Sequence, residues 1–562
     1  MVKRNRCNIQ KLSADMAEAS LVQAKKNLTR LQQMHIKSTE FAEEIGQIIV
    51  DLRQVPAPAG EPFLFTTVLE ENENLLRVVF HDCGDIEFRS FNAGGRKALL
   101  VYLGGMSDTV NLETNIMRPL MKQTGSLDEQ GNDSGKSSQG LPSDMQAIAE
   151  NILGSASITV LGKASVAIET VMIGSALLLI DGLAEVLSVS AAQFAKRNIS
   201  ESDNEHILQG PNEAFNEVMV DNVVLLRRRA HDVSLKMRIF KIGIRTQTSI
   251  AVLYIGDLVK PGLLEEVERR LANINIDKIL SSTVIQELLI DHPWSPFPQA
   301  QTTERPDKML AALYEGRIGM IVDGTPTGIM VPCTYNVLMQ SPDDYTIQPI
   351  IGSSIRLMRH VAAFIAVYLP AIYVAVVSYH PGMLPTAMAI TIAELRSRNP
   401  FPSFLEAVMM EILLEVFQEA VLRLPKKLSG AASMIGALVI GTTIVQAGII
   451  NPLLVVVIAL TALASYSMPS YNFSMALRWL RIPILILSSI LGLYGVVLGI
   501  LAVTVHLCSL RSFGESYVGG MFNVDLISDW KDSIVRVPAS LLKQRPKEFG
   551  AQDQIRIGDG DG

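Results

Sequence analysis

Three long stretches of this chain contain no Asp, Glu, Lys or Arg, and all of them lie in its last third. They run from Val361 to Ala393, from Leu428 to Leu477 and from Ile482 to Leu510. About 20 apolar residues in a helix cross the hydrocarbon core of a bilayer. The sequence therefore predicts an integral membrane protein whose membrane module follows a long segment that is patterned like a water-soluble protein.

The long segment before the membrane module alternates strand and helix patterns, which is typical of α/β layering. We expect an α/β soluble N-terminal module of two small subdomains, followed by an all-α transmembrane module. Proline and glycine clusters and shifts in composition place the boundaries. The expected parts are an N-terminal helical segment (1–55), a first α/β subdomain (56–123), a flexible linker (124–144), a second α/β subdomain (145–350), a transmembrane helical domain (351–511) and a cytoplasmic tail (512–562).

A repeated pattern supports two related subdomains. The segments Leu99–Asp108 and Ala251–Lys260 both contain an apolar-apolar-Tyr-apolar-Gly sequence and both precede a helix pattern. We expect strands at Leu76–Phe80, Ala98–Leu103 and Ile250–Ile255. Two ordinary strand–turn–helix units would match nearly as well by chance, so duplication and coincidence both remain open.

Composition and motifs exclude several classes of function. The formal net charge of −7 argues against a nucleic-acid binder, which concentrates basic residues on one face. The four cysteines are far apart and form no CxxC pair, so we expect neither a disulfide framework nor a zinc site. The chain contains no phosphate-binding loop and no metalloprotease, hydrolase or kinase motif. We therefore expect no enzyme, no catalytic residues, no cofactor and no metal site.

The topology of the membrane module follows from the placement of basic residues. The N-terminus has no apolar segment of signal-peptide type, so the first module should stay in the cytoplasm. Arg356, Arg359 and His360 precede the first apolar stretch, and positive charge marks the cytoplasmic end of a membrane helix. Arg478 and Arg481 are expected in a polar connector. Four crossings then fit a cytoplasmic tail, at Val361–Tyr379, Ala431–Ile450, Leu453–Tyr466 and Ile482–Leu507.

A helix predicted from Pro402 to Leu422 carries three aligned carboxylates. Glu411, Glu415 and Glu419 lie four residues apart and therefore share one face. Like charges at this spacing repel each other, and the cost rises near lipid. Three explanations remain open: a non-crossing or re-entrant amphipathic helix with its acidic face in water, the wall of a cation path, or salt bridges to a partner chain. These glutamates are our candidate ion-path or polar membrane face.

Small residues mark candidate contacts between helices in the following apolar stretch. Gly436, Gly441 and Gly448 lie there. Packing rather than hydrophobicity drives helix association in lipid, and small residues let two helices approach closely. We therefore expect these three glycines to be helix-packing positions.

Scattered but ordered residues carry a family resemblance. In the soluble part they are Gln209–Glu217, Asn222, Leu226–Arg229, Arg245–Thr248, Val252–Ile255, Pro296–Gln299, Thr303–Asp307, Glu315–Ile318 and Val322–Pro326. In the membrane module they are Glu415–Ala420, Arg423–Pro425, Ile435–Gly441 and Gln446–Gly448. In their order and spacing they resemble the A subunits of GerA-type spore germinant receptors, over about Leu75 to Leu510. The chain has Gln418 where this family typically has Arg, so no role of that arginine is carried over.

The resemblance implies a function in spore germination. Such A subunits lie in the spore inner membrane and act with a B subunit, a multi-span nutrient-binding protein, and with a C subunit, a lipoprotein. They are expected to form homo-oligomers and to form or gate a path for monovalent cations. Two alternatives remain open: a scaffold subunit that conducts nothing, and the related A-subunit-like protein that works beside the dipicolinate release channel.

Overall fold

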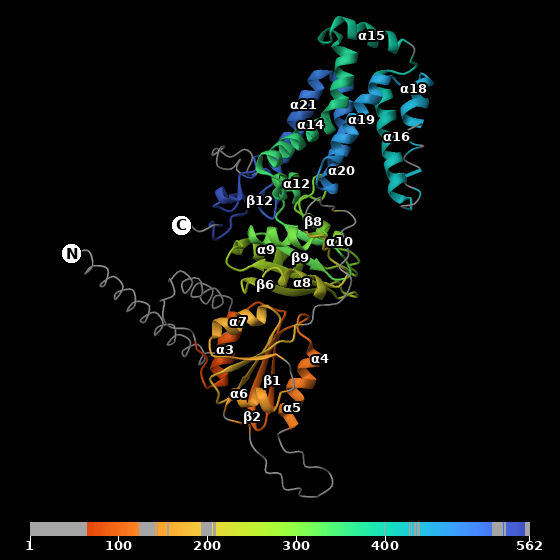
Figure 1. Ribbon diagram of the computed structural model, residues 1–562. Helices are drawn as coiled ribbons and strands as arrows, with labels where there is room; N and C mark the ends of the chain where they lie inside the picture. Colours follow the sequence, from red (N-terminus) through yellow and green to blue (C-terminus); the bar gives the residue numbers. More distant parts are fainter. Residues whose placement is uncertain are drawn as a thin grey trace, which may run out of the picture. The chain divides into compact units, whose positions relative to one another are not determined.

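The computed structural model of the protein describes residues 64–122, 141–142, 144–153, 157–192, 205, 210–397, 399–425, 428, 430–431, 434, 436, 439–519, 532 and 535–556. The expected N-terminal helix (1–55) and most of the expected linker (124–144) lie outside these residues. The chain forms two compact units (Figure 1). The first ends at Phe194, and the second contains Asp82–Asp85 together with everything from Ala195 onward.

The first unit is built on a five-stranded antiparallel sheet. Its strands are β1 (Ile86–Ala93), β2 (Arg96–Leu103), β3 (Ile158–Leu161), β4 (Ala176–Ile180) and β5 (Val186–Val189), in the order β1-β2-β4-β5-β3. The interior strand β2 is buried on both faces from Ala98 onward. One set of helices, α3 (Leu69–Val79) and α7 (Ala164–Met172), contacts β2. The hydrophobic core on the other face of the sheet is completed by α4 (Thr109–Leu112), a π-helix (Glu113–Met117), α5 (Arg118–Lys122) and α6 (Met145–Asn151).

Two expectations about this unit are wrong. The expected strand at Leu76–Phe80 is the second half of α3, because Leu69, Asn72 and Leu76 bury one face at helical spacing. The expected boundary between the subdomains also moves. Strands β3 to β5, which the sequence placed in the second subdomain, pair with β1 and β2 in the first sheet. Pairing between strands that are far apart in the sequence leaves no local signal. The expected linker at 124–144 therefore suggested a domain boundary, although the first sheet contains strands from both sides of it.

The second unit contains a sheet of the same design. Its strands are β6 (Leu235–Ile242), β7 (Thr248–Ile255), β8 (Gln301–Thr303), β9 (Ile318–Val322) and β10 (Gly328–Val331), in the order β6-β7-β9-β10-β8. Helices α8 (Met219–Arg227) and α11 (Pro306–Tyr314) complete the core on one face. Helices α9 (Pro261–Ala272) and α10 (Ser282–Leu289) complete the core on the other.

The two sheets are repeats of one another, which resolves the choice between duplication and coincidence. Their strand orders are identical once the second set is renumbered. The agreement extends to single hydrogen bonds. Asn72 accepts from the Thr66 amide at 3.0 Å and donates to its carbonyl at 2.7 Å. Asn222 makes the same two bonds to Asn216, at 2.8 and 2.7 Å. In both repeats, therefore, a buried asparagine of the first helix holds the backbone just before that helix with two hydrogen bonds.

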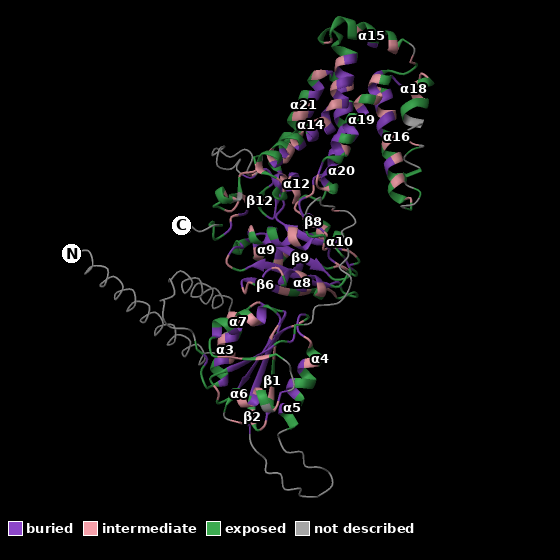
Figure 2. Ribbon diagram, viewed as in Figure 1, coloured by how far each residue is buried: buried purple, intermediate pink, exposed green. Residues whose placement is uncertain are grey.

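The rest of the second unit is a helical bundle. After the short helices α12 (Tyr335–Met339) and α13 (Asp343–Thr346) come α14 (Pro349–Tyr379), a 3-10 turn (Pro381–Met383), α15 (Thr386–Arg396), α16 (Ser403–Arg423), a π-helix (Val439–Thr443), α18 (Ile444–Gln446), α19 (Pro452–Tyr466), α20 (Tyr471–Leu491) and α21 (Leu493–Ser509). By length and hydropathy α14 and α20 could each cross a membrane, and α19 and α21 are shorter apolar helices. Buried residues run along α14, whereas α15 is mostly exposed (Figure 2).

Two expectations about the bundle are corrected. Gly492, with a φ of +61°, divides the expected last span between α20 and α21. A side chain there would meet His380, so the break is a close helix contact as well as a turn. Arg478 and Arg481 lie inside α20 and not in a connector. The helix of the three glutamates, α16, packs against α14, α19 and α20. The apolar sequence from Ile482 to Leu507 contains no polar segment that would have indicated the break between α20 and α21.

The segment after the bundle folds onto the second α/β repeat. It contains β11 (Arg511–Ser512), β12 (Glu515–Ser516) and two 3-10 turns (Ala539–Leu541 and Lys547–Phe549). Phe549 is buried, and the amide of Gln552 donates to the carbonyl of Leu258 at 3.0 Å. The hydroxyl of Ser512 donates to the carbonyl of Gln299 at 2.7 Å. The described part of the expected tail is therefore an integral layer of this repeat.

Candidate functional site

Glu411, the first of the three candidate carboxylates, is buried inside the helical bundle. Its Oε2 lies 3.1 Å from Nη1 of Arg481, whose side chain is only 2% exposed. Its second oxygen, Oε1, is also buried and has no hydrogen-bond partner among the described residues. A buried carboxylate with a free acceptor atom is costly unless water or a cation reaches it. Glu411 is therefore the member of the set whose position most needs an explanation.

Arg481 joins four helices at the level of Glu411. Its Nε donates to the carbonyl of Ala366 in α14 at 2.5 Å. One Nη2 contact goes to the carbonyl of Thr461 at 3.4 Å and another to the hydroxyl of Ser465, both in α19. With Glu411 on α16 and Arg481 itself on α20, one guanidinium connects α14, α16, α19 and α20. The fork of donors on an arginine makes this possible.

The other two glutamates of α16 are both about half exposed. Glu415 is 52% exposed and lies 3.6 Å from Nη1 of Arg478, which also donates to Gln418. Glu419 is 54% exposed and lies 2.5 Å from Arg423, one turn further along the same helix. An arginine of the same chain therefore faces each carboxylate. The repulsion expected between aligned carboxylates is offset within the chain, which is a solution that the sequence reasoning did not consider.

The arginines of α20 were the main omission of the sequence reasoning. Ser474, Arg481 and Ser488 are all buried and recur every seven residues, which places them on one face of a helix. That period was visible in the sequence. Arg478 and Arg481 were instead expected in a connector, because charged residues in an apolar stretch suggest a loop outside the membrane.

The three candidate glycines lie in different surroundings. A side chain at Gly436 would collide with the ring of Phe417 in α16, so that ring lies directly against the Gly436 backbone. A side chain at Gly441 or Gly448 would meet no atom within 4 Å. Gly448 has a φ of +64° and occupies a turn. Their assignment as helix-packing positions stays a prediction, and only Gly436 already has a neighbour within the chain.

A second group of buried charges ties the start of α14 to α13 and to the tail. At the start of α14, Asp344 accepts from Arg356 at 3.0 Å and from Arg359 at 2.7 Å. Arg356 also reaches the Asp532 carboxylate at 3.1 Å. The ring of Tyr345 lies 5.1 Å from the Arg356 guanidinium. The helix that leaves the soluble part is therefore held at its base by paired charges, which resist displacement because an unpaired buried charge is strongly unfavourable.

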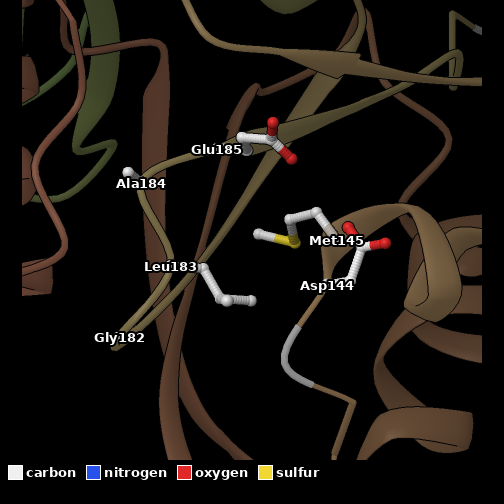
Figure 3. Close-up of a pocket in the computed structure, with 6 residues that line it drawn as sticks. All are labelled: Asp144, Met145, Gly182, Leu183, Ala184 and Glu185. Carbon is white, nitrogen blue, oxygen red and sulfur yellow. The ribbon is translucent and has the colours of Figure 1, made fainter.

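The first unit has a small open cleft of about 350 Å³. It lies between the start of α6 and the loop Gly182–Glu185, with the side chains of Met145 and Leu183 between the two segments (Figure 3). The carboxylate of Asp144 already accepts from the Gln146 amide at 3.1 Å as the cap of α6. Glu185 supplies the cleft's other carboxylate, and the lining contains no cationic or nucleophilic side chain.

The described residues contain no cluster of three His, Cys, Asp or Glu side chains that could hold a metal ion. The cysteine at the centre of the second unit is also a poor nucleophile. Burial raises the pKa of Cys333 to about 12, so the thiol keeps its proton at neutral pH.

Comparison with known proteins identifies the family. The family model described as Bacillus/Clostridium GerA spore germination protein matches residues 74–548. Spore germination protein B1 of Bacillus subtilis is 36% identical over 87% of this chain and 98% of its own length. An uncharacterized membrane protein of Bacillus subtilis, YfkQ, is 36% identical over 86% of this chain and 91% of its own.

One solved structure is also similar. It is the N-terminal domain of the A subunit of the Bacillus megaterium spore germinant receptor GerK3, at 29% identity and a TM-score of 0.37, covering 49% of this chain and 98% of that one. The sequence matches alone confirm the resemblance drawn from scattered motifs. The chain belongs to the GerA family of Bacillus and Clostridium spore germination proteins.

Proposed function

We propose that this protein is the A subunit of a germinant receptor whose oligomer forms or gates a path for monovalent cations. It acts with a multi-span nutrient-binding B subunit and a lipoprotein C subunit. The protein lies in the spore inner membrane, with the α/β repeats and the tail on the cytoplasmic side. Family membership supports the role in germination. The arrangement of charge on α16 supports the cation path.

The observation that carries the cation path is the difference in burial among the three glutamates. Glu415 and Glu419 are both about half exposed, at 52% and 54%, and Glu411 is buried with one acceptor oxygen free. This series leads from the end of α16 toward the centre of the bundle. Carboxylates set a preference for cations in a conducting pathway. The arrangement described here is the closed state, because an arginine faces each carboxylate.

Opening then requires α16 to move relative to α20. Such a movement separates Glu411 from Arg481 and Glu415 from Arg478, which exposes carboxylates to passing cations. A nutrient bound to a partner subunit favours the open state by its difference in affinity for the two states. The reaction is a change of conformation, and no catalytic step is involved.

Self-association is supported by an apolar face at the base of α14. This helix has 31 residues and a length of about 46 Å, which exceeds the roughly 30 Å of a bilayer core. Its first turns therefore extend beyond the lipid. There, Ile350 is 82%, Leu357 57% and Met358 58% exposed. Contact with a second copy would cover this face, and the open space beside Gly441 and Gly448 would admit a neighbouring helix.

The orientation follows from charges at one end of the bundle. Arg356 and Arg359 lie near the start of α14, and Arg423 closes α16. Contacts of Gln418 with Arg478 and of Glu406 with Asn451 show that α16 runs back toward the start of α20. All three arginines therefore lie at the end nearest the second α/β repeat. By the positive-inside rule, these arginines support a cytoplasmic location for that end.

Potassium efflux from vesicles that contain the reconstituted three-subunit receptor tests the proposal. Glu415→Gln should reduce nutrient-triggered efflux several-fold, because it removes a carboxylate from the path. Arg478→Gln should raise basal efflux, because it frees the same carboxylate from its partner. Glu287→Gln, at an exposed position on α10, is the matched control and should change nothing.

The signs of these effects separate the cation path from the alternatives. Efflux that is unchanged in both variants would remove the acidic wall from the mechanism. An assembled receptor that conducts nothing in any form would favour a scaffold subunit.

A further inference from the structure

Trp294 is the most exposed of the large apolar side chains that the structure describes, at 97%. It lies in the loop between α10 and β8. A tryptophan carries a large apolar ring system, and leaving it in water forfeits the free energy of its burial. Trp294 is therefore a large apolar side chain that does not contribute to the hydrophobic core of its own chain.

The loop around this tryptophan is rigid. The side-chain amide of Gln299 donates to the His292 carbonyl at 2.7 Å and accepts from the His292 amide at 2.8 Å. The Ser295 amide donates to the same carbonyl at 3.1 Å, which closes a turn. The hydroxyl of Tyr517 donates to the carbonyl of Pro298 at 3.0 Å. The exposure is therefore built into the structure, since these bonds and three prolines fix the backbone.

The loop rests against the membrane bundle. The hydroxyl of Ser295, the next residue, lies 2.9 Å from Nε2 of His506 near the end of α21. The ring of Phe297 lies 6.0 Å from that histidine and 6.2 Å from Phe473 at the start of α20. Trp294 is thus the outermost member of an aromatic layer at the end of the bundle nearest the repeat.

This aromatic layer lies roughly 20–27 Å from the opposite end of the bundle, somewhat less than the thickness of a hydrocarbon core. The opposite end is marked by the close contact of Gly492 with Tyr379, where α14, α20 and α21 meet. From there, α20 runs roughly 27 Å back to Phe473 and α21 roughly 20 Å to His506, at 1.5 Å per residue. The hydrocarbon core is about 30 Å thick. The layer therefore falls where hydrocarbon gives way to headgroups.

We propose that Trp294 inserts into the interfacial layer of the same membrane that the bundle crosses. The loop from Pro293 to Pro298 is then a lipid contact that fixes the second α/β repeat against the membrane surface. Tryptophan is enriched at this depth because its ring is apolar and its indole N–H can still reach polar headgroups. The exposed side chain of Arg511, directly after α21, adds attraction for anionic headgroups. This inference is independent of the cation path.

Tryptophan fluorescence of the full chain in vesicles tests the proposal. The chain has two other tryptophans, Trp479 and Trp530, and changing both to Phe leaves Trp294 as the reporter. The vesicles contain phosphatidylethanolamine and phosphatidylglycerol, with a quenching group either near the headgroup or near the bilayer centre. We expect the headgroup-level quencher to act roughly twofold more strongly than the central one, as for an interfacial side chain.

Two controls fix the scale of the measurement. A chain that retains only Trp479 is the deep control. This residue is 67% exposed on α20, about 9 Å further into the bundle than Phe473, and the central quencher should affect it more strongly. A chain whose only tryptophan comes from Tyr314→Trp is the aqueous control, because Tyr314 lies on α11 of the soluble repeat. Only an aqueous quencher should reach it.

Each other outcome overturns the proposal. If Trp294 behaves like the aqueous control, the loop does not reach lipid. If neither lipid nor aqueous quenchers reach it, protein covers it, as contact with a second copy or a partner subunit would. Where the double substitution lowers the yield of folded protein, the quenching difference between the natural chain and Trp294→Tyr measures the same quantity with both other tryptophans in place.

Discussion

The two α/β repeats place an arginine at equivalent positions near the end of their first helix, and they use it in opposite ways. In the first repeat Arg77 is 52% exposed and pairs at 2.7 Å with Glu73 of the same helix. In the second repeat Arg227 is fully buried and holds both oxygens of Asp85, at 2.7 and 2.9 Å. The same residue type is thus a surface side chain in one copy and a structural connection in the other.

The difference separates what specifies the repeat from what connects it to the rest of the protein. Features that both copies share serve the fold: the strand order, the buried asparagine and an aspartate that caps the first helix. Asp181 accepts from the Leu69 amide at 3.2 Å, and Asp323 accepts from the Met219 amide at 3.1 Å. Buried charged side chains, by contrast, are found in the second unit and not among the described residues of the first.

The second unit, by contrast, contains all of the fully buried arginines among the described residues. They are Arg227, Arg305, Arg317, Arg356 and Arg481. Arg227 holds the segment Asp82–Asp85, and Arg356 joins α14 to the tail. Buried pairs are a weak source of net stability, but losing one partner is costly. Arg227 and Arg356 therefore fix the position of segments that the repeat itself does not specify.

Removing the buried arginine should have the largest effect. Arg227→Leu leaves Asp85 buried without its partner, so we expect a loss of about 3–5 kcal/mol in the free energy of unfolding. Arg77→Leu should cost less than about 1 kcal/mol, since exposed pairs contribute little. Urea unfolding of the purified protein in detergent, followed by circular dichroism, measures both.

A double variant sharpens this test. Arg227→Leu combined with Asp85→Leu should recover much of the stability, because no charge is then left unpaired. Equal losses for Arg77→Leu and Arg227→Leu would contradict the distinction between the two repeats.

The shared asparagines should have equal effects. Asn72→Ala and Asn222→Ala each leave a backbone amide and a backbone carbonyl without their partner, at an expected cost of about 2–3 kcal/mol. Native-state hydrogen exchange assigns each loss to its own repeat. Asn115→Ala, on the exposed side chain that bonds Asn111, is the control and should cost less than about 0.5 kcal/mol. Effects that differ greatly between the repeats would show that the motif is not equivalent.

A smaller effect is expected from a position at which the repeats differ. After α7 the first repeat has Ile173 followed by a glycine, whereas after α11 the second has Glu315 followed by a glycine. Burial raises the pKa of Glu315 to about 7. The folded protein therefore keeps a proton that the unfolded chain loses, and stability falls as the pH rises from about 4.5 to about 7.

Glu315→Gln should remove this dependence. We expect it to raise stability above pH 7 by about 2 kcal/mol, and to change little well below pH 4.5, where the carboxyl is protonated in both states. Thermal unfolding of both proteins across this pH range measures the difference. Parallel pH profiles for the two proteins would mean that another group carries the effect.

Much of the architecture could be predicted because its signals are local. The strands β2 and β7 are apolar segments that end at glycines, and the sequence located both of them. The repeated motif was visible in the same two segments. The helix α3 was missed because its apolar residues also suit a strand, and only the packing of Leu69 and Leu76 against β2 decides between the two forms. The subdomain boundary was missed because strand pairing is not local.

The candidate site was predictable only in part. Four-residue spacing fixed Glu411, Glu415 and Glu419 on one helical face, since helix geometry needs no other information. It could not supply the arginines that face them, because Arg478 and Arg481 come from a helix about 60–70 residues further along the chain.

The sequence by itself determined that this chain combines a soluble α/β part with a membrane part, and that it belongs among germinant receptor A subunits. Apolar length, residue period and ordered motifs are properties of the sequence. The tertiary structure alone decided which charges meet, which arginine is buried, and that Trp294 is held outside the core. Contact energies depend on distances between segments remote in the chain, and only the folded state brings those segments together.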